Sequence, residues 1–212
     1  MSRSKSSSRW LRDHFNDVYV KKAQKEGYRS RAIYKLKEID EKESFLRQGM
    51  VVVDLGAAPG GWTQYVVEKL QGKGCIIALD ILPMDSLPQV HYIQGDFREE
   101  AVLEKLNHCL LGRKVDVLLS DMAPNMSGNA VVDISRAMYL AELALDFAQM
   151  WLKADGVMFI KVFHGVGFDM LVKNMRGLFK RVTVRKPDSS RASSRETYIL
   201  AKGFRGIGDQ TT

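Results

Sequence analysis

The stretch at 51–62 constrains the fold more than any other part of the chain. An apolar β-branched run ends at Asp54, and a glycine-rich turn then leads into a helix-like segment that starts at Trp62. Glycines at such a turn remove side chains that would block close approach, and they permit backbone angles that other residues avoid. A strand, a tight turn and a helix N-terminus in this order bring backbone amides up to a bound cofactor. The stretch therefore predicts a nucleotide-like cofactor at the end of the first strand.

This turn differs from the dinucleotide-binding fingerprint. From Gly56 the chain reads G-A-A-P-G-G, where the dehydrogenase pattern is G-x-G-x-x-G. Pro59 also has no amide hydrogen to donate to a pyrophosphate. An acidic residue shortly before the first glycine fits a cofactor that carries a cationic group and no phosphate. These features favour S-adenosylmethionine, and a tight strand-to-helix turn without a ligand is the structural alternative.

Strand-like apolar runs alternate with helix-like segments through the rest of the chain. This alternation predicts an α/β fold, a Rossmann-like seven-stranded and mostly parallel sheet with helices on both faces. A chain of 212 residues fits one domain of this kind. We expect strands at 51–55, 75–80, 90–94, 115–121, 157–163, 181–185 and 197–201. We expect helices at 30–41, 62–70, 98–108, 133–152 and 168–179.

Acidic residues stand at the ends of four expected strands, where ligands of such sheets collect. Asp54 and Asp80 belong to the first two strands. Asp96 follows the third strand, and Asp121 ends the fourth. Any one of them could cap a helix, but four clustered like charges would repel one another if they served stability alone. Asp80 follows Gly56 by 24 positions, near the spacing expected for a carboxylate that holds ribose hydroxyls.

Lys161 interrupts the apolar run at 157–163, where an unpaired buried charge would be costly. One interpretation is that its side chain extends from the strand end to solvent. The other places its amine at the carboxyl edge of the sheet beside Asp121, whose carboxylate would offset the loss of hydration.

Basic residues are concentrated near the two ends of a chain whose net charge is +7. Residues 1–35 hold ten Lys or Arg against three Asp or Glu, and residues 180–205 hold eight against two, whereas the middle of the chain is acidic. This distribution predicts contact with a polyanion, although residues 1–9 could be only a solubilising tail. Interleaved tyrosines and serines favour nucleic acid as the partner. The candidate contacts are Arg29, Arg31, Arg185, Lys186, Arg191 and Arg195.

Composition argues against several other classes of protein. No apolar run approaches the roughly 20 residues that span a bilayer, and the basic, serine-rich start of the chain lacks an apolar signal core. Cys75 and Cys109 form no C-x-x-C pair, and the four histidines complete no metal motif. We therefore expect a reduced, cytoplasmic, metal-free monomer that does not contact a membrane.

Motifs that carry a specific resemblance cover nearly the whole chain apart from the C-terminal tail. They are SSSRW at 6–10, RSRA at 29–32, DLGAAPGGW at 54–62, DMAPNMSG at 121–128, RAMYL at 136–140, KVF at 161–163, RKPDSSR at 185–191 and SRE at 194–196. Together they resemble the bacterial FtsJ/RrmJ family, S-adenosylmethionine-dependent 2′-O-ribose methyltransferases of large-subunit (23S) ribosomal RNA. The resemblance implies a class I methyltransferase fold. It also implies a catalytic domain at 29–205, between a basic extension at 1–28 and a flexible tail at 206–212.

The resemblance implies a catalytic Lys–Asp–Lys–Glu quartet, which falls on Lys35, Asp121, Lys161 and Glu196 without substitution. The implied reaction is in-line attack of a ribose 2′-hydroxyl on the sulfonium methyl, for which alignment supplies much of the rate. A lysine amine is a poor base at neutral pH unless a neighbouring cation or desolvation lowers its pKa. Our hypothesis is that Lys161 is the general base and Lys35 tunes or positions it, while the two carboxylates hold the amines. Alternatively, Lys161 only steers the hydroxyl.

The resemblance also implies how S-adenosylmethionine is held. Asp80 would accept hydrogen bonds from the ribose hydroxyls and Asp96 from the adenine amino group, with the methionine moiety near the glycines of the turn. Trp62 is either a cofactor contact or simply a core aromatic residue at a helix start. The implied cofactor contacts are Gly56, Gly60, Trp62, Asp80, Asp96 and Asp121.

Three other functions are compatible with parts of this sequence. The missing middle glycine and Pro59 disfavour an NAD-dependent oxidoreductase. A base methyltransferase would carry an Asp/Asn-Pro-Pro-aromatic element or a nucleophilic cysteine where this chain reads DMAP at 121–124. A non-catalytic RNA-binding or ribosome-assembly factor would need only the basic ends, and a dual role stays open. By resemblance, the substrate is a uridine of 23S ribosomal RNA in the large subunit or a late precursor.

Overall fold

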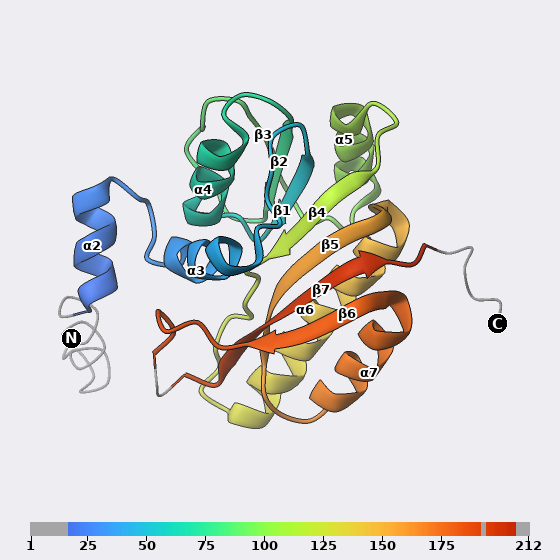
Figure 1. Cartoon of the computed structure of the whole chain (residues 1–212). Helices are drawn as coiled ribbons and strands as arrows, with labels where there is room; N and C mark the ends of the chain where they lie inside the picture. The colour runs from blue at the N-terminus through green and yellow to red at the C-terminus, as the bar shows by residue number, and fades with distance from the viewer. Residues whose placement is uncertain (1–16, 192–193, 207–212) are drawn as a thin grey trace.

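The computed structural model describes residues 17–191 and 194–206. Within them, seven strands form one sheet in the order β3-β2-β1-β4-β5-β7-β6 (Figure 1). Neighbouring strands pair in parallel except at β7, which is antiparallel to both β5 and β6. The predicted mostly parallel α/β sheet is thus confirmed. The strands are β1 (Val51–Leu55), β2 (Cys75–Asp80), β3 (Val90–Gln94), β4 (Val115–Ser120), β5 (Leu152–Phe163), β6 (Phe179–Arg185) and β7 (Glu196–Phe204).

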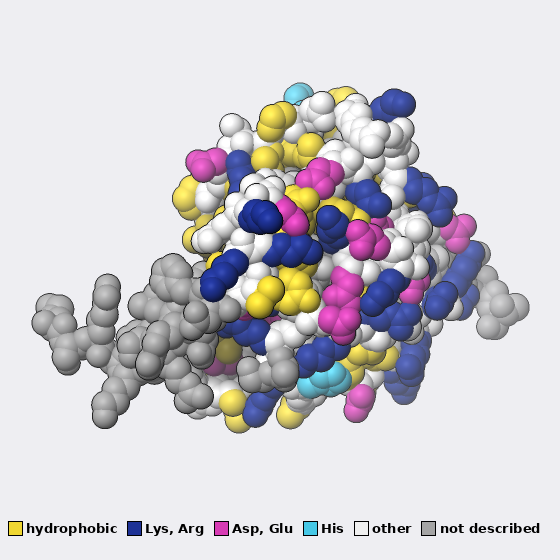
Figure 2. Space-filling model, turned by 60° about the vertical axis from the view of Figure 1, so that its left-hand side comes forward, with side chains coloured by type: hydrophobic (Ala, Val, Ile, Leu, Met, Phe, Trp, Pro, Cys, Tyr) yellow, Lys and Arg dark blue, Asp and Glu magenta, His cyan; other side chains and the backbone are white. Residues whose placement is uncertain are grey.

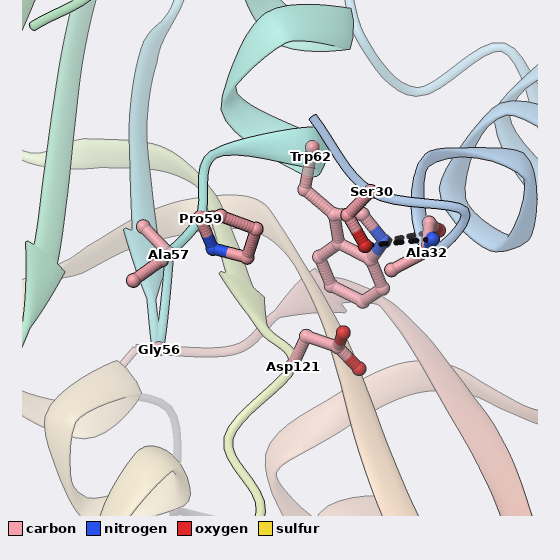
Figure 3. A pocket seen from close by; sticks show the side chains of 9 residues that line it. Ser30, Ala32, Gly56, Ala57, Pro59, Trp62 and Asp121 are labelled. Atoms are coloured by element: carbon pink, nitrogen blue, oxygen red, sulfur yellow. Dashed lines mark hydrogen bonds between the residues drawn. The ribbon is translucent and has the colours of Figure 1, made fainter. Parts of the chain in front are cut away.

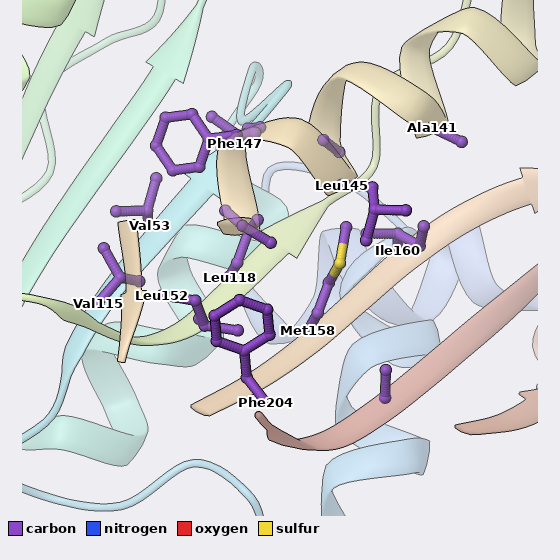
Figure 4. Close-up of a cluster of buried hydrophobic side chains, with 14 of the residues drawn as sticks. Val53, Val115, Leu118, Ala141, Leu145, Phe147, Leu152, Met158, Ile160 and Phe204 are labelled. Carbon is purple, nitrogen blue, oxygen red and sulfur yellow. The ribbon is translucent and has the colours of Figure 1, made fainter. Parts of the chain in front are cut away.

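Helices cover both faces of the sheet, so its central strands are mostly apolar. All five residues of β1 are buried, and they alternate between two cores. Val53 packs in the larger core with α5, α6 and α7, part of which Figure 4 shows. Val52 packs in the second core with α3 and α4. The helices are α2 (Val18–Glu26), α3 (Ile33–Glu43), α4 (Gly61–Leu70), α5 (Glu100–Leu110), α6 (Ala130–Trp151) and α7 (Phe168–Leu178).

Two predicted helices begin three residues away from where they were expected, because of local hydrogen bonds. The helix expected from residue 30 begins at Ile33, since the Ser30 hydroxyl accepts a bond from the amide of Ala32 and closes a turn there. The helix expected from residue 133 begins at Ala130, because the Asn129 side chain caps the first amides. Strand β5 also begins earlier than expected, at Leu152, directly after α6.

Helix α2 lies within the segment that was expected to be a basic extension. Asp17 caps it by accepting a bond from the amide of Tyr19, and its residues Val20 and Ala23 are buried. The rest of that segment (1–16) and most of the expected tail (207–212) lie outside the described residues. None of the described helices is long and apolar enough to cross a membrane.

The direction of β7 brings one further residue to the carboxyl edge of the sheet. Strands β1, β2, β4 and β5 all end at this edge, and the antiparallel β7 starts there with Glu196. The register of the two strands pairs Phe163 with Glu196 and Lys161 with Tyr198. Side chains that are distant in sequence therefore meet beside the end of β4.

Candidate active site

Two lysine–carboxylate pairs lie at the carboxyl edge of the sheet. The Nζ atom of Lys161 lies 3.0 Å from Oδ1 of Asp121 and donates to its carbonyl oxygen at 2.5 Å. The Nζ atom of Lys35 lies 2.6 Å from Oε1 of Glu196. Only 8% of the Lys161 side chain is exposed, so it does not extend to solvent, and the carboxylate offsets the cost of burying its charge. The structure thus brings all four predicted quartet residues into two ion pairs.

Tyr198 joins the two pairs, and sequence reasoning did not include it in the site. Its hydroxyl lies 3.4 Å from Oδ1 of Asp121, and its ring centroid lies 5.6 Å from Nζ of Lys35. Burial and the charges of Asp121 and Glu196 raise the pKa of Tyr198 well above its ordinary value, so its hydroxyl stays protonated. The sequence feature that indicates its place in the site is its position two residues after Glu196, which puts both side chains on the same face of one strand.

In the glycine turn, residues 54–62, Gly56 leaves no room for a side chain. Gly56 has a φ of +74°, and a Cβ atom there would lie 2.7 Å from Cγ of Met122. The amide of Gly56 donates to the carbonyl of Leu79 at 2.8 Å. Because this amide is already bonded, the turn offers a cofactor close approach to the backbone rather than that donor.

Two acidic residues of the cofactor side differ in their environment. Asp80 accepts bonds from the amides of Ala58 at 2.9 Å and Leu82 at 2.8 Å, so it holds the glycine turn against the loop that follows β2. Asp54 is fully buried, and its Oδ2 atom accepts a bond from the Thr63 hydroxyl at 2.7 Å. Among the described residues, its Oδ1 atom has no hydrogen-bond partner.

Burial therefore dominates the ionisation of Asp54. It raises the pKa of Asp54 to about 7, against the Thr63 hydrogen bond and together with the negative charges of Asp121 and Asp80. A buried carboxyl group with an unpaired oxygen is stabilised by a nearby cation or by a proton. Asp54 is the acidic residue ahead of Gly56 that led us to expect a cofactor with a cationic group, and that cofactor stays a prediction.

A small cavity of about 30 Å³ opens between the glycine turn and the end of β4 (Figure 3). Trp62 and Asp121 both line it. The indole of Trp62 is also buried in the core, where it stacks on Phe159 with ring centroids 5.2 Å apart and donates to the carbonyl of Ala32 at 2.7 Å. Trp62 is thus a core aromatic residue that borders the cavity, and its contact with a cofactor stays a prediction.

Asp96 lies after β3 and is bound to an arginine. The Nε atom of Arg98 lies 3.0 Å from both of its carboxylate oxygens. Hydrogen bonds from Arg98 lower the pKa of Asp96. An adenine amino group that bonded to Asp96 would either share this carboxylate with Arg98 or displace Arg98 from it.

Three of the arginines proposed to contact RNA form ion pairs within the protein. Arg31 and Arg191 both bind the carboxylate of Asp17, the latter at 3.1 Å. Arg185 binds Glu43 at 2.7 Å. These contacts join the loop between β6 and β7 to α2 and α3. The positive charge of these arginines is therefore partly neutralised where RNA was expected to bind.

The other three proposed RNA contacts differ from one another. Lys186 and Arg195 are exposed on the loop between β6 and β7, and Lys186 donates to the carbonyl of Ser194 at 2.7 Å. Arg29 is bonded to backbone carbonyls beside the glycine turn. Figure 2 shows Lys and Arg side chains spread over one face with Asp and Glu among them.

Comparisons with known proteins show the family of this chain. Residues 28–204 match the model of the FtsJ-like methyltransferase family. The chain belongs to this family. It is 65% identical over 204 residues to the ribosomal RNA large subunit methyltransferase E of Legionella pneumophila (strain Corby), which covers 96% of this chain and 99% of that protein. A protein of the same name from Dichelobacter nodosus (strain VCS1703A) is 60% identical over 96% of this chain and 98% of its own.

A solved structure extends the agreement to the fold of this methyltransferase. The crystal structure of a ribosomal RNA methyltransferase from Plasmodium falciparum matches with a TM-score of 0.77 at 33% sequence identity. The match covers 84% of this chain and all of that chain, 100%. The family membership confirms the methyltransferase interpretation and argues against the oxidoreductase.

Proposed function

We propose that this methyltransferase transfers a methyl group from S-adenosylmethionine to a ribose 2′-hydroxyl of large-subunit ribosomal RNA, on a uridine. The buried pair of Lys161 and Asp121 beside the glycine turn carries the proposal, because it sets an amine where an acceptor hydroxyl would meet the methyl donor. The relatives' names support the substrate class, 23S ribosomal RNA in the large subunit or a late precursor. We infer that a monomer acts in the cytoplasm.

The residues at the carboxyl edge fit S-adenosylmethionine. When bound, it supplies an electrophilic methyl group on a sulfonium sulfur. Gly56 has no side chain to block approach to the backbone, and an ionised Asp54, whose Oδ1 atom has no partner among the described residues, would attract the cationic part of the ligand. Asp80 would hold the ribose hydroxyls, Asp96 the adenine amino group, and Trp62 would border the reacting end.

The quartet residues then act on the acceptor hydroxyl. This hydroxyl must lose its proton during or after attack, and in our proposal Lys161 accepts it as a neutral amine and becomes an ammonium that Asp121 holds. Asp121 holds the Lys161 amine by a contact of 3.0 Å, so the amine does not need to be ordered during the reaction. Lys35 adds a second positive charge on the far side of Tyr198, and Glu196 fixes its position.

Two substitutions of Lys161 test whether it is the base or only steers the hydroxyl. Lys161→Ala removes both roles, whereas Lys161→Arg keeps a positive donor that does not act as a base. If Lys161 is the base, both variants should lose on the order of 100-fold or more in methyl transfer. Calorimetry should show nearly unchanged binding of S-adenosylmethionine. An arginine variant with more than roughly a tenth of wild-type turnover would support steering instead.

The position of the methyl group tests the rest of the proposal. Large subunits from cells that lack the gene are incubated with the enzyme and labelled S-adenosylmethionine, and the RNA is then hydrolysed in alkali. A 2′-O-methyl group blocks cleavage at one linkage, so a single resistant dinucleotide that begins with uridine is the expected product. Label on a base, or at no nucleotide of the large subunit, would contradict the proposed acceptor. Naked 23S RNA in a parallel reaction shows whether the assembled subunit is required.

A further inference from the structure

Arg29 was expected to contact RNA, but its guanidinium is bonded to the protein backbone. Its Nη1 atom donates to the carbonyl of Asp85 at 2.8 Å and to that of Pro59 at 3.3 Å. Its Nη2 atom donates to the carbonyl of Ser86 at 3.0 Å. Pro59 belongs to the glycine turn, and the other two residues belong to the loop at 81–89 that follows β2. One side chain thus bridges the two segments that border the proposed cofactor site.

The backbone of Arg29 is itself fixed to the helix that follows the turn. Its amide donates to Oε1 of Gln64 at 2.7 Å, and Nε2 of Gln64 donates to the carbonyl of Gly27 at 3.2 Å. Gln64 lies in α4, which begins at the end of the glycine turn. The backbone from which the guanidinium extends is therefore held by the helix that directly follows the glycine turn.

Gly60 is packed against the Arg29 side chain. A Cβ atom at Gly60 would lie 3.0 Å from Nη1 of Arg29 and 3.0 Å from Sδ of Met84, a residue of the 81–89 loop. Its φ of +108° also favours glycine. The turn, the arginine and the loop therefore form one packed unit.

Asp80 connects the same two segments through the opposite kind of group. Its carboxylate accepts from the amide of Ala58 in the turn and from that of Leu82 in the loop. Arg29 donates to carbonyls of the turn and the loop, so an anion and a cation each bridge them. A planar guanidinium with several fixed donors can bond three carbonyls at once, which an ammonium on a flexible chain does less well.

We propose that Arg29 is a positioning residue of the cofactor site: it fastens the 81–89 loop to the glycine turn and so holds these two segments, which Asp80 also joins, in the arrangement that S-adenosylmethionine needs. The inference rests on the proposed function for the identity of the ligand. It assigns Arg29 to the cofactor side of the reaction and removes it from the expected RNA contacts.

The test compares Arg29→Ala with Arg47→Ala, which removes an exposed arginine beyond the other end of α3. For Arg29→Ala we expect the Kd of S-adenosylmethionine to rise at least tenfold by calorimetry. The KM of the cofactor should rise by a similar factor, while kcat at saturating cofactor stays within about twofold. RNA affinity should fall no more than in Arg47→Ala, because each loses one positive charge.

Hydrogen exchange tests the fastening of the loop without any ligand. Amides of the 81–89 loop should exchange faster in Arg29→Ala than in the wild-type protein, whereas those of α7 should not change. If the wild-type protein bound no S-adenosylmethionine, the proposed function would fail, and the exchange experiment would still decide whether Arg29 fastens the loop.

Three results would overturn the proposal. One is unchanged cofactor affinity in Arg29→Ala, and another is a loss of RNA affinity alone. If Arg29→Ala failed to fold, Arg29→Lys would replace it, with an expected intermediate rise of about threefold to fivefold in the Kd of the cofactor. The third result is an Arg29→Lys variant with the cofactor affinity and the hydrogen exchange of the wild-type protein, since a positive charge alone would then suffice.

Discussion

At the scale of single residues, Asp54 combines complete burial with an unpaired carboxylate oxygen. Such a group is costly to ionise, and its neighbours Asp80 and Asp121 add to that cost. Thr63 offsets part of it with one hydrogen bond. An ionised Asp54 therefore destabilises the free protein at the strand end that is proposed to attract a cationic cofactor.

Asp54→Asn should remove a pH dependence of stability. Burial raises the pKa of Asp54 to about 7 from an ordinary value of 3.8, so the folded state holds this proton more tightly than the unfolded state. Its contribution is fully present below pH 3.8 and is lost as the pH rises through 7. The free energy of unfolding of the variant minus that of the wild-type protein should therefore increase by about 1–3 kcal/mol as the pH rises from 4 to 8. Chemical denaturation across this range measures the difference.

Thr63→Val provides the control for this prediction. It removes the hydrogen bond that lowers the pKa of Asp54, so the loss of stability should continue to a higher pH than in the wild-type protein. If the stabilities of the wild-type protein and Asp54→Asn changed in parallel with pH, Asp54 would not ionise as described.

Residues that end parallel strands were the ones that sequence reasoning placed correctly. Asp121 follows one apolar run and Lys161 lies near the end of another, and the carboxyl ends of both runs must meet at one edge, so a contact between them was one of the two expected arrangements. Tyr198 could not be placed in this way, because its position depends on the antiparallel register of β7 against β5. The backbone contacts of Arg29 could not be predicted, because a cation in a basic segment gives no sign that backbone carbonyls surround it.

At the scale of elements, Glu43 ties the end of α3 to the two antiparallel strands. Its Oε2 atom lies 2.8 Å from Nζ of Lys202 on β7, and its Oε1 atom lies 2.7 Å from Nη2 of Arg185 on β6. Hydrogen bonds from Lys202 and then Arg185 lower the pKa of Glu43 to about 2. This helix carries Lys35, so its attachment bears on the geometry of the site.

Glu43→Gln should destabilise the protein at neutral pH and much less in acid. A carboxyl group whose pKa falls from 4.5 to about 2 on folding contributes stability above pH 4.5, which is lost as the pH falls toward 2. We expect a loss of about 1–2 kcal/mol at pH 7, measured by urea denaturation, and a smaller difference near pH 3.

Asp155→Asn is the matched control for Glu43→Gln. Asp155 also pairs with a lysine, Lys180, but their side chains are 69% and 60% exposed. Its loss should change the free energy of unfolding by less than about 0.5 kcal/mol. Equal effects of the two substitutions would show that the attachment of α3 does not depend on Glu43.

The elements themselves were predicted more accurately than their ends. Hydrophobic runs located all seven strands. In the central strands, burial on both faces leaves mostly apolar sequence, whereas β3 and β6 at the two edges of the sheet are only partly buried. The start of α6 was missed because the cap is made by Asn129, ahead of the apolar pattern. Helix α2 was missed because only Val20 and Ala23 of its nine residues are buried, so its pattern is mostly polar.

At the scale of the whole molecule, the fold brings parts of the two basic segments together. Asp17, ahead of α2, binds Arg31 and Arg191, and Glu38 of α3 accepts bonds from the amides of Asp188 and Ser189. The loop between β6 and β7 therefore lies against the N-terminal helices. Two charged segments separated by about 150 positions form one surface, which a polyanion could contact as a unit.

On this surface, the exposed cations Lys186 and Arg195 should contribute to RNA affinity without sequence preference. Each phosphate contact releases counterions, so Lys186→Ala combined with Arg195→Ala should lower the slope of log K against log salt by about 0.7–0.9 per cation. The affinity of this double variant for ribosomal RNA and for unrelated RNA should fall by the same factor. The comparison variant combines Lys105→Ala on α5 with Lys173→Ala on α7, exposed cations from helices of the opposite sheet face. Binding curves at several salt concentrations measure both slopes, and an equal fall in both variants would mean that RNA senses only the net charge.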